Sequence, residues 1–139
     1  MDWVTGMSVD KAQVRAFYDE SREGSHGRHT DAFEQEGRRD VIVSLLKRIK
    51  LSNPKALDIG CGAGWLMKEV AAAIGGDFIG TDISPRSLQE ASVESPQTSF
   101  IAMDAEAHAL KSESLDLIVC SEVIEHLPSP QSALAEMYR

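Results

Sequence analysis

The stretch that most constrains the fold is Lys55-Ala-Leu-Asp-Ile-Gly-Cys-Gly-Ala-Gly-Trp-Leu66, in which glycine occupies every second position of the centre. The residues before Gly60 form a short apolar run, as in a buried strand, and those after Gly64 continue as an amphipathic helix. Glycine permits a sharp turn between the two and leaves no side chain in the space beside it. The stretch therefore predicts a strand, a tight turn and a helix in direct succession.

A carboxylate ends the next predicted strand. In Phe78-Ile-Gly-Thr-Asp-Ile-Ser84, Asp82 lies eighteen residues after Gly64. In α/β folds a glycine turn approaches a nucleotide-like ligand, and an acid at the end of the following strand accepts hydrogen bonds from ribose hydroxyls. The two segments together predict a pocket for a ribose-bearing cofactor.

Short apolar runs alternate with amphipathic segments along the rest of the chain, which is typical of an α/β fold with a parallel sheet and helices on both faces. Ser84-Pro85 and Ser129-Pro130 each offer an N-cap serine followed by a proline at the first helical position. The last helix is expected to turn Ala133, Leu134, Met137 and Tyr138 inward. Helices are expected over 9–22, 31–49, 65–74, 85–93 and 130–139, and strands over 56–59, 77–81, 98–103 and 115–120.

The composition excludes several classes of partner. The chain has 22 acidic and 14 basic residues, a formal net charge of -8, so it offers no basic surface for a nucleic acid. No apolar run approaches the ~20 residues of a membrane span, and the N-terminus lacks a signal-peptide core. A cytoplasmic protein without a membrane partner is therefore expected. Cys61 and Cys120 are not closely spaced, and neither a disulfide nor a metal site is expected from them.

The glycine spacing distinguishes between cofactors. A dinucleotide turn reads G-x-G-x-x-G/A, but position 65 is tryptophan here, where a pyrophosphate would need glycine or alanine. Asp58, two residues before the first glycine, would also repel a pyrophosphate and would suit a cofactor that carries an ammonium group. S-adenosylmethionine has an ammonium, a sulfonium and a ribose, and no phosphate.

Four ordered motifs resemble those of class I S-adenosylmethionine-dependent methyltransferases, especially the small-molecule enzymes of the ubiquinone-biosynthesis type. Leu57-Asp-Ile-Gly-Cys-Gly-Ala-Gly64 is similar to the first motif of that family, and Gly80-Thr-Asp-Ile-Ser84 to its second-strand motif. Met103-Asp-Ala-Glu106 resembles the end of the third strand, and Leu115-Asp-Leu-Ile-Val-Cys-Ser-Glu-Val-Ile-Glu-His-Leu127 the fourth-strand motif. The resemblance implies a Rossmann-like sheet with the strand order 3-2-1-4 and S-adenosylmethionine as the cofactor, with S-adenosylhomocysteine as the product.

The resemblance also implies roles for single residues around the methionine and ribose parts of the cofactor. The backbone from Gly60 through Cys61 to Gly62 would lie against the methionine part. Asp58 would orient the amine through water, or alternatively bond only local backbone. Asp82 would accept both ribose hydroxyls.

At the adenine end, Ile83 would pack on the ring, and Asp104 and Ala105 would meet its amino edge, although Asp104 could instead cap a turn. Cys120 would offer its backbone carbonyl to the cofactor.

The cluster Glu122, Glu125 and His126 leaves alternatives open. His126 is the candidate general base, because histidine can accept a proton near neutral pH. The same stretch merely orders the loop beside the pocket in many family members. A metal site on the three side chains is the weaker alternative, and no metal is assigned.

Two regions are expected: an N-terminal helical cap or lid over residues 1–52, and the cofactor-binding Rossmann-like portion over 53–139. Within the first, Phe17 and Tyr18 either fold over the cofactor or form an ordinary core face.

The chain departs from the family after its fourth strand. The family sheet has seven strands in the order 3-2-1-4-5-7-6, whereas this sequence stops in the helix after strand 4 and would leave that strand as an apolar edge. A truncated fragment is the favoured interpretation. A half-domain completed by a homodimer, or by a partner chain along that edge, is the alternative.

The sequence therefore predicts methyl transfer from S-adenosylmethionine to a small-molecule acceptor, with oxygen slightly favoured over nitrogen or carbon. The rival functions are a non-catalytic cofactor-binding module, or a fragment inactive without its missing half, and a nicotinamide-dependent reductase.

Overall fold

The computed structural model describes residues 10–21 and 32–139. Within them four parallel strands form one sheet in the order β3-β2-β1-β4. The strands are β1 (Lys55–Ile59), β2 (Asp77–Asp82), β3 (Ser99–Ala102) and β4 (Leu117–Cys120). The helices are α1 (Lys11–Ser21), α2 (Ala32–Ile49), α3 (Trp65–Ile74), α4 (Pro85–Glu94), the short 3-10 helix η1 (Ile124–His126) and α5 (Pro130–Tyr138).

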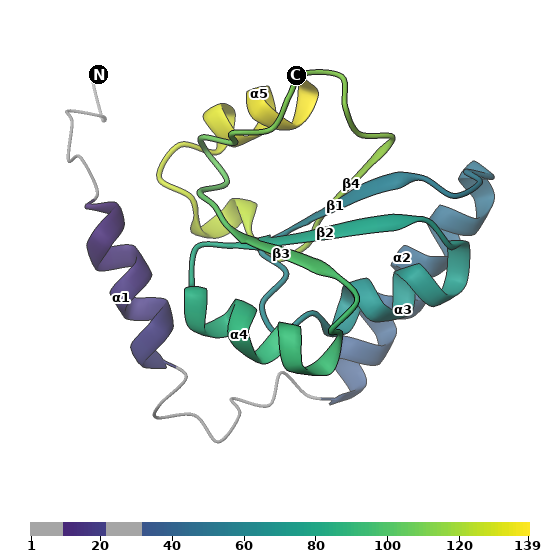
Figure 1. Cartoon of the computed structure of the whole chain (residues 1–139), viewed down its shortest axis with the longest axis horizontal. Coiled ribbons are helices and arrows are strands. Elements are labelled where there is room, and N and C mark those ends of the chain that lie inside the picture. The colour runs from purple at the N-terminus through teal and green to yellow at the C-terminus, as the bar shows by residue number, and fades with distance from the viewer. Residues whose placement is uncertain (1–9, 22–31) are drawn as a thin grey trace.

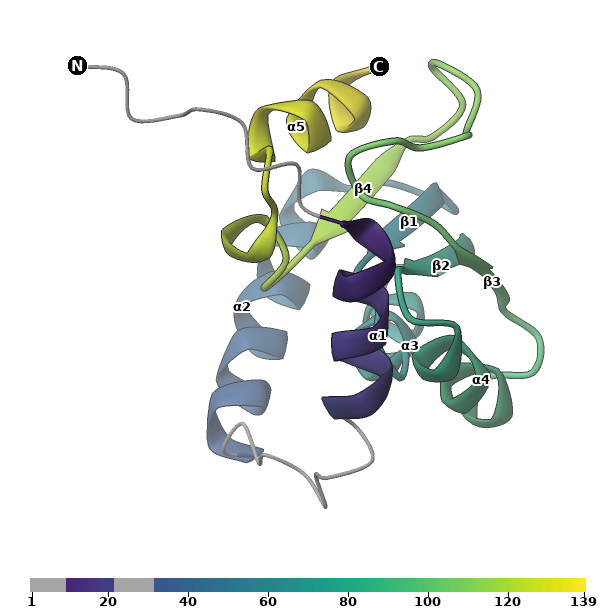
Figure 2. The same ribbon diagram turned by 90° about the vertical axis from the view of Figure 1, so that its left-hand side faces the viewer.

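The predicted Rossmann-like class and strand order are confirmed, and the expected elements form with small shifts of their ends. Figure 1 shows α2, α3 and α4 on one face of the sheet and α5 on the other. In Figure 2, α1 stands in front of the sheet, between α2 and α4. The predicted start and end of the first helix at residues 9 and 22 lie outside the described residues. None of the described helices combines the length and the apolar character that crossing a membrane requires.

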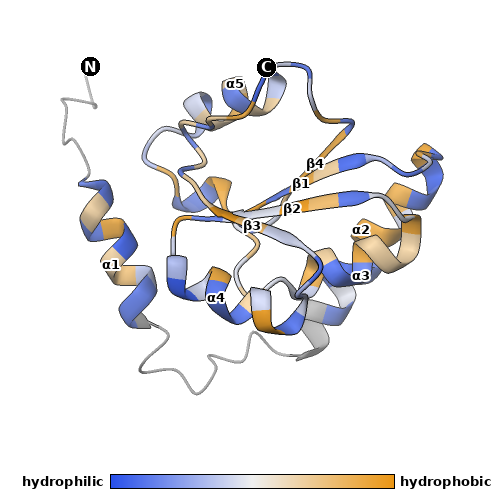
Figure 3. Cartoon of the chain, in the orientation of Figure 1, coloured by the Kyte–Doolittle hydropathy of each residue, from blue (hydrophilic) through white to orange (hydrophobic). Residues whose placement is uncertain are grey.

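The core lies between the sheet and the α2–α3 pair. Leu46 of α2, Leu66 and Val70 of α3 and Val119 of β4 form its buried cluster. Burying such side chains contributes about 1.5–3 kcal/mol each, so this layer anchors the strand that precedes the glycine turn. In Figure 3 hydrophobic colour gathers on the strands and on α3, whereas α1 and α4 alternate along their length.

Two expectations for the last helix are wrong. Of the four α5 residues expected to point inward, Ala133 is fully buried and Met137 is half-buried, whereas Leu134 and Tyr138 remain 51% and 95% exposed. The periodicity identifies an apolar face, but it does not show how much of that face a neighbouring element covers. The Ser129 side chain makes no hydrogen bond to the helix backbone and pairs with the Ser132 hydroxyl at 2.8 Å instead. At α4 the predicted N-cap forms, because Ser84 Oγ accepts a hydrogen bond of 3.1 Å from the N–H of Ser87.

Two glycine substitutions should change stability in opposite directions. At Gly76 φ is +110°, and a Cβ would lie 2.4 Å from the Pro54 carbonyl oxygen, so Gly76→Ala should lower the free energy of unfolding by about 2–4 kcal/mol. At Gly37, inside α2, a Cβ meets nothing within 4 Å, so Gly37→Ala should raise it by about 0.5–1 kcal/mol. Urea denaturation measures both, and equal effects of the two substitutions would contradict the described course of the chain after α3.

Candidate functional site

The glycine turn between β1 and α3 is held by the two strands beside β1. The N–H of Cys61 donates a hydrogen bond of 2.9 Å to the carbonyl of Thr81 in β2. On the other side, a Cβ at Gly60 would lie 2.3 Å from Cγ2 of Val123, because the loop after β4 packs directly on the turn. Gly60 also has φ of +69°, in the left-handed region that favours glycine. The turn and the loop after β4 therefore form one packed unit.

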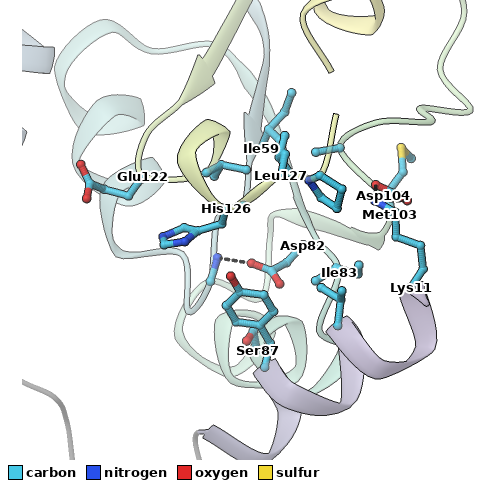
Figure 4. A pocket seen from close by; sticks show the side chains of 17 residues that line it. Lys11, Ile59, Asp82, Ile83, Ser87, Met103, Asp104, Glu122, His126 and Leu127 are labelled. Carbon is cyan, nitrogen blue, oxygen red and sulfur yellow. Dashed lines mark hydrogen bonds and ion pairs between the residues drawn. The ribbon is translucent and has the colours of Figure 1, made fainter. Parts of the chain in front are cut away.

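Asp82 joins the turn to the start of α4. Its Oδ2 accepts a hydrogen bond of 2.9 Å from the N–H of Gly62, the dashed line in Figure 4, and its Oδ1 accepts one of 2.9 Å from the N–H of Ser84. A carboxylate oxygen has two lone pairs, so both oxygens can still accept a hydrogen bond from a ligand. Asp82 therefore supports the turn and is also an acceptor for the cavity that it lines.

A cavity of about 250 Å³ opens beside the turn, at the carboxyl ends of the strands. In open parallel sheets the crevice at these ends is where ligands bind. In Figure 4, Lys11, Met103 and Asp104 lie at one end of it, and Glu122 and His126 lie at the other. The lining residues are Lys11, Val14, Tyr18, Ile59, Gly60, Gly62, Asp82, Ile83, Ser87, Met103, Asp104, Ala105, Glu122, Val123, His126, Leu127 and Pro128.

One face of α1 forms a wall of this cavity through Lys11, Val14 and Tyr18. The ring of Phe17 packs edge-on against that of Tyr18 with centroids 5.4 Å apart, but Phe17 is 65% exposed. Burial, and then the charges of Asp82 and Glu125, raise the pKa of Tyr18. Of the two aromatic residues proposed for a lid, the structure thus brings Tyr18 to the site and leaves Phe17 outside it.

Asp58 lies behind the turn rather than on the cavity surface. It is 4% exposed, and its Oδ2 has no hydrogen-bond partner. Burial, and then repulsion from Asp82, raise the pKa of Asp58 to about 7. The protein therefore carries a buried carboxyl group that holds its proton close to neutral pH, because burial and the neighbouring charge of Asp82 disfavour its ionised form.

The thiol of Cys120, at the end of β4, is unreactive. Burial, and then the charges of Asp58 and Glu125, raise the pKa of its thiol to about 11. A thiol with such a pKa stays protonated and is a poor nucleophile. The thiol of Cys120 is therefore not a candidate nucleophile for the site.

The loop after β4 presents Glu122 and His126 to the cavity. Glu122 has φ of +59°, a backbone conformation that residues other than glycine rarely adopt. Its carboxylate lies 3.5 Å from the guanidinium of Arg38 in α2. His126 Nε2 lies 3.8 Å from Glu125 Oε1. In residues 10–21 and 32–139 no group of three or more His, Cys, Asp or Glu side chains is arranged to hold a metal ion.

Most of the site residues predicted from the sequence meet in this one cavity: Gly60, Gly62, Asp82, Ile83, Asp104, Ala105 and His126 line it. Three do not. Asp58 and Cys61 are buried next to the lining, and Cys120 is half-buried.

The sequence reasoning missed Lys11 and Val14. Together with Tyr18 they recur at i, i+3 and i+7, a spacing that places all three on one face of a helix. The spacing indicates that the three side chains share a helix face, but the neighbouring sequence does not indicate that this face packs against the carboxyl ends of the strands.

Comparisons with protein families and with curated relatives both match this chain to methyltransferases. The family described as Methyltransferase domain matches residues 57–139. A ubiquinone biosynthesis O-methyltransferase of Leptothrix cholodnii is 38% identical over 89 residues, which are 60% of this chain and 37% of that protein. The same enzyme of Photorhabdus laumondii is 35% identical over 85 residues, 58% of this chain and 35% of that protein. The chain thus spans little more than a third of the length of these relatives.

Solved structures share the fold. Magnesium protoporphyrin IX methyltransferase from Synechocystis with bound SAM superposes with a TM-score of 0.72 at 22% identity, over 96% of this chain and 73% of that one. The N-methyltransferase NodS from Bradyrhizobium japonicum, in complex with S-adenosyl-L-homocysteine, gives a TM-score of 0.69 at 25% identity, over 88% and 66% of the two chains.

The raised pKa of Asp58 makes a prediction about the ligand-free protein. An acid whose pKa rises on folding holds its proton more tightly in the folded state, so stability falls as the pH rises from its ordinary value near 3.8 to about 7, and the full cost remains above that. Between pH 5 and pH 8 the unfolding free energy of the native chain should therefore fall by about 2–3 kcal/mol relative to that of Asp58→Asn. Urea denaturation at both pH values measures this difference, and a difference independent of pH would show that Asp58 is ionised throughout.

Proposed function

The chain belongs to the class I S-adenosylmethionine-dependent methyltransferases, and we propose that it binds S-adenosylmethionine and transfers the methyl group to a small-molecule acceptor. The observation that carries the proposal is the meeting of the glycine turn, Asp82 and Asp104 around one cavity. When bound, the cofactor supplies a methyl group activated by its sulfonium charge. The chain's own residues bind the cofactor and orient the acceptor toward that group.

The polar groups of the cavity match the parts of this cofactor. Asp82 retains free lone pairs for the two ribose hydroxyls, and Ile83 is the apolar surface for the adenine ring. Asp104 and Ala105 meet the adenine amino edge, because a carboxylate accepts from an amino group. The backbone of Gly60–Gly62 lies against the methionine part, and the Cys120 carbonyl is a further acceptor.

Electrostatics also favours this cofactor over a dinucleotide. Asp82, Asp104 and Glu122 line the cavity. Of the lining residues that the structure describes, Lys11 is the one lysine and is paired with carboxylates, and Glu122 is paired with Arg38 of α2. A pyrophosphate would meet net negative charge, whereas a sulfonium and an ammonium would be attracted. Asp58 lies behind the turn, where its carboxylate would stabilise the ammonium through water.

The acceptor is proposed to present a hydroxyl group, because the relatives from Leptothrix cholodnii and Photorhabdus laumondii are named as O-methyltransferases. His126 lines the cavity from the loop after β4, where it would accept the proton of that hydroxyl as the methyl group arrives. Displacement at a methyl group depends chiefly on holding the two reactants in line. Residues 53–139 are proposed as the cofactor-binding portion and 1–52 as the N-terminal helical segment, in which α1 covers the cavity and α2 packs on α3 in the core.

Removal of the ribose acceptor should weaken cofactor binding. A hydrogen bond to a charged group contributes about 1.5–3 kcal/mol, so Asp82→Ala should raise the Kd for S-adenosylmethionine by roughly tenfold to a hundredfold. Calorimetry measures the Kd, and Asp77→Ala is the matched control, since Asp77 is exposed at the opposite end of β2. Because Asp82 also bonds Gly62 and Ser84, unfolding without ligand must be measured in parallel, so that the Kd is taken where the variant is folded. Unchanged affinity would contradict the ribose assignment.

Removal of the base should affect chemistry and leave binding intact. His126→Gln should lower the rate of methyl transfer to hydroxyl acceptors about a hundredfold and leave the Kd for S-adenosylmethionine unchanged. Transfer of labelled methyl groups to a panel of hydroxyl and amine acceptors measures the rate. An equal rate in the variant would reduce His126 to a residue that shapes the loop. Tight cofactor binding by the native chain without any turnover would identify a non-catalytic module.

A further inference from the structure

The first helix contacts the candidate site through charged groups at both of its ends. Near its start, Lys11 Nζ lies 3.1 Å from Asp104 Oδ2 and also pairs with the carboxylate of Glu106. Near its end, Asp19 accepts a hydrogen bond from the Ser84 hydroxyl, and the N–H of Ser84 donates to Asp82. Lys11 and Asp19 are eight positions apart, about 12 Å along a helix. The helix thus reaches from the carboxylate at the ribose end to the carboxylate at the adenine end.

The two carboxylates beside Lys11 are themselves held in place. Asp104 Oδ1 accepts the N–H of Glu106 at 2.9 Å, and the other carboxylate oxygen of Glu106 accepts the N–H of Ser129 at the start of α5. The side chain of Glu106 is 10% exposed, and that of Asp104 is 26% exposed. Two carboxylates that both lie within ion-pair distance of one ammonium group are close enough to repel each other when that cation is absent. The Lys11 ammonium is that cation.

The ion pair leaves Asp104 usable by a ligand. Oδ1 already accepts from Glu106 and from Lys11, whereas Oδ2 forms only the ion pair with Lys11 among the described residues and keeps a lone pair. Asp104 and Lys11 both line the cavity, so this lone pair is available at its adenine end. Burial lowers the pKa of Lys11, but its hydrogen bonds to Glu106 and Asp104 outweigh that effect and raise it, so the ammonium stays charged at neutral pH.

We propose that Lys11 is a positioning residue for the adenine end of the cofactor: its ammonium holds the Asp104 carboxylate toward the cavity and fixes α1 as the outer wall. The proposal rests on the proposed function, because it takes S-adenosylmethionine as the ligand. It adds that recognition of the base depends on a residue of α1, which lies about ninety positions before Asp104 in the sequence. Lys11 acts through Asp104 and α1, and no contact of its own with the reacting atoms is required.

The test uses the full chain and two unreactive ligands, S-adenosylhomocysteine and its inosine analogue, in which a carbonyl oxygen replaces the adenine amino group. Asp104 can accept a hydrogen bond from the amino group and can only repel the carbonyl oxygen. The native chain should therefore prefer S-adenosylhomocysteine by about thirtyfold or more.

Lys11→Met keeps the length of the side chain and removes its charge. It should bind S-adenosylhomocysteine about five- to twentyfold more weakly, and its preference over the inosine analogue should shrink to about fivefold or less, because Asp104 is no longer held in place. Lys11→Arg keeps the positive charge, so it should retain most of the native affinity for S-adenosylhomocysteine and most of the native preference over the inosine analogue. Lys47→Met, which removes the same charge from the exposed face of α2, is the matched control and should behave as the native chain.

Thermal unfolding without ligand shows whether each variant is folded at the temperature of the calorimetry. Lys11→Gln is the second neutral variant, should Lys11→Met unfold. A neutral variant that is folded and keeps both the affinity and the preference of the native chain overturns the proposal. If the native chain is folded and binds S-adenosylhomocysteine no better than the Asp82→Ala variant does, the proposed function itself fails, and this inference fails with it.

Discussion

The carboxylate of Asp82 is the interaction on which the rest of the site depends. It ends β2 and accepts one N–H from the glycine turn after β1 and one from the cap of α4. Without it, the N–H groups of Gly62 and Ser84 would each lose their hydrogen-bond acceptor. The geometry that supports the fold is therefore also the geometry that presents an acceptor to the cavity. Fold and ligand recognition share one side chain, which is why its substitution must be judged by stability as well as by affinity.

The electrostatics of the ligand-free protein follow from the same crowding of acids. Asp58 lies behind the turn with an unpartnered oxygen, close enough to Asp82 for the two charges to repel. Among the described cavity-lining residues Lys11 is the one lysine, and it is committed to Asp104 and Glu106. A bound cation would relieve the repulsion between Asp58 and Asp82, and this relief would contribute to the binding free energy of the proposed cationic cofactor.

Local sequence predicted the sheet, because strand, turn and cap signals are written in neighbouring residues. Gly60–Gly64, Asp82 and the Ser84 cap form as expected, and each depends on contacts within one or two elements. What could not be predicted is how distant elements meet. Tyr138 is apolar by pattern but exposed, since periodicity does not show what covers a face. Ser129 has the cap residue and the following proline, yet its N–H donates to Glu106 and its hydroxyl pairs with Ser132, because a tertiary contact competes with the local one. The place of Lys11 at the site also depends on a tertiary contact, its ion pairs with Asp104 and Glu106, which its local sequence does not indicate.

The parts of the site differ in how firmly they are held. Val123 packs against Gly60 so closely that the loop carrying His126 cannot shift without moving the glycine turn. The glycine turn and the loop that carries His126 are thus coupled by packing, which allows few alternative arrangements. The adenine end is different, because α1 meets it through ion pairs and hydrogen bonds whose strength depends on charge and water. The proposal for Lys11 therefore implies that sequence changes in α1 adjust cofactor affinity, while the packing of Val123 on the glycine turn stays in place.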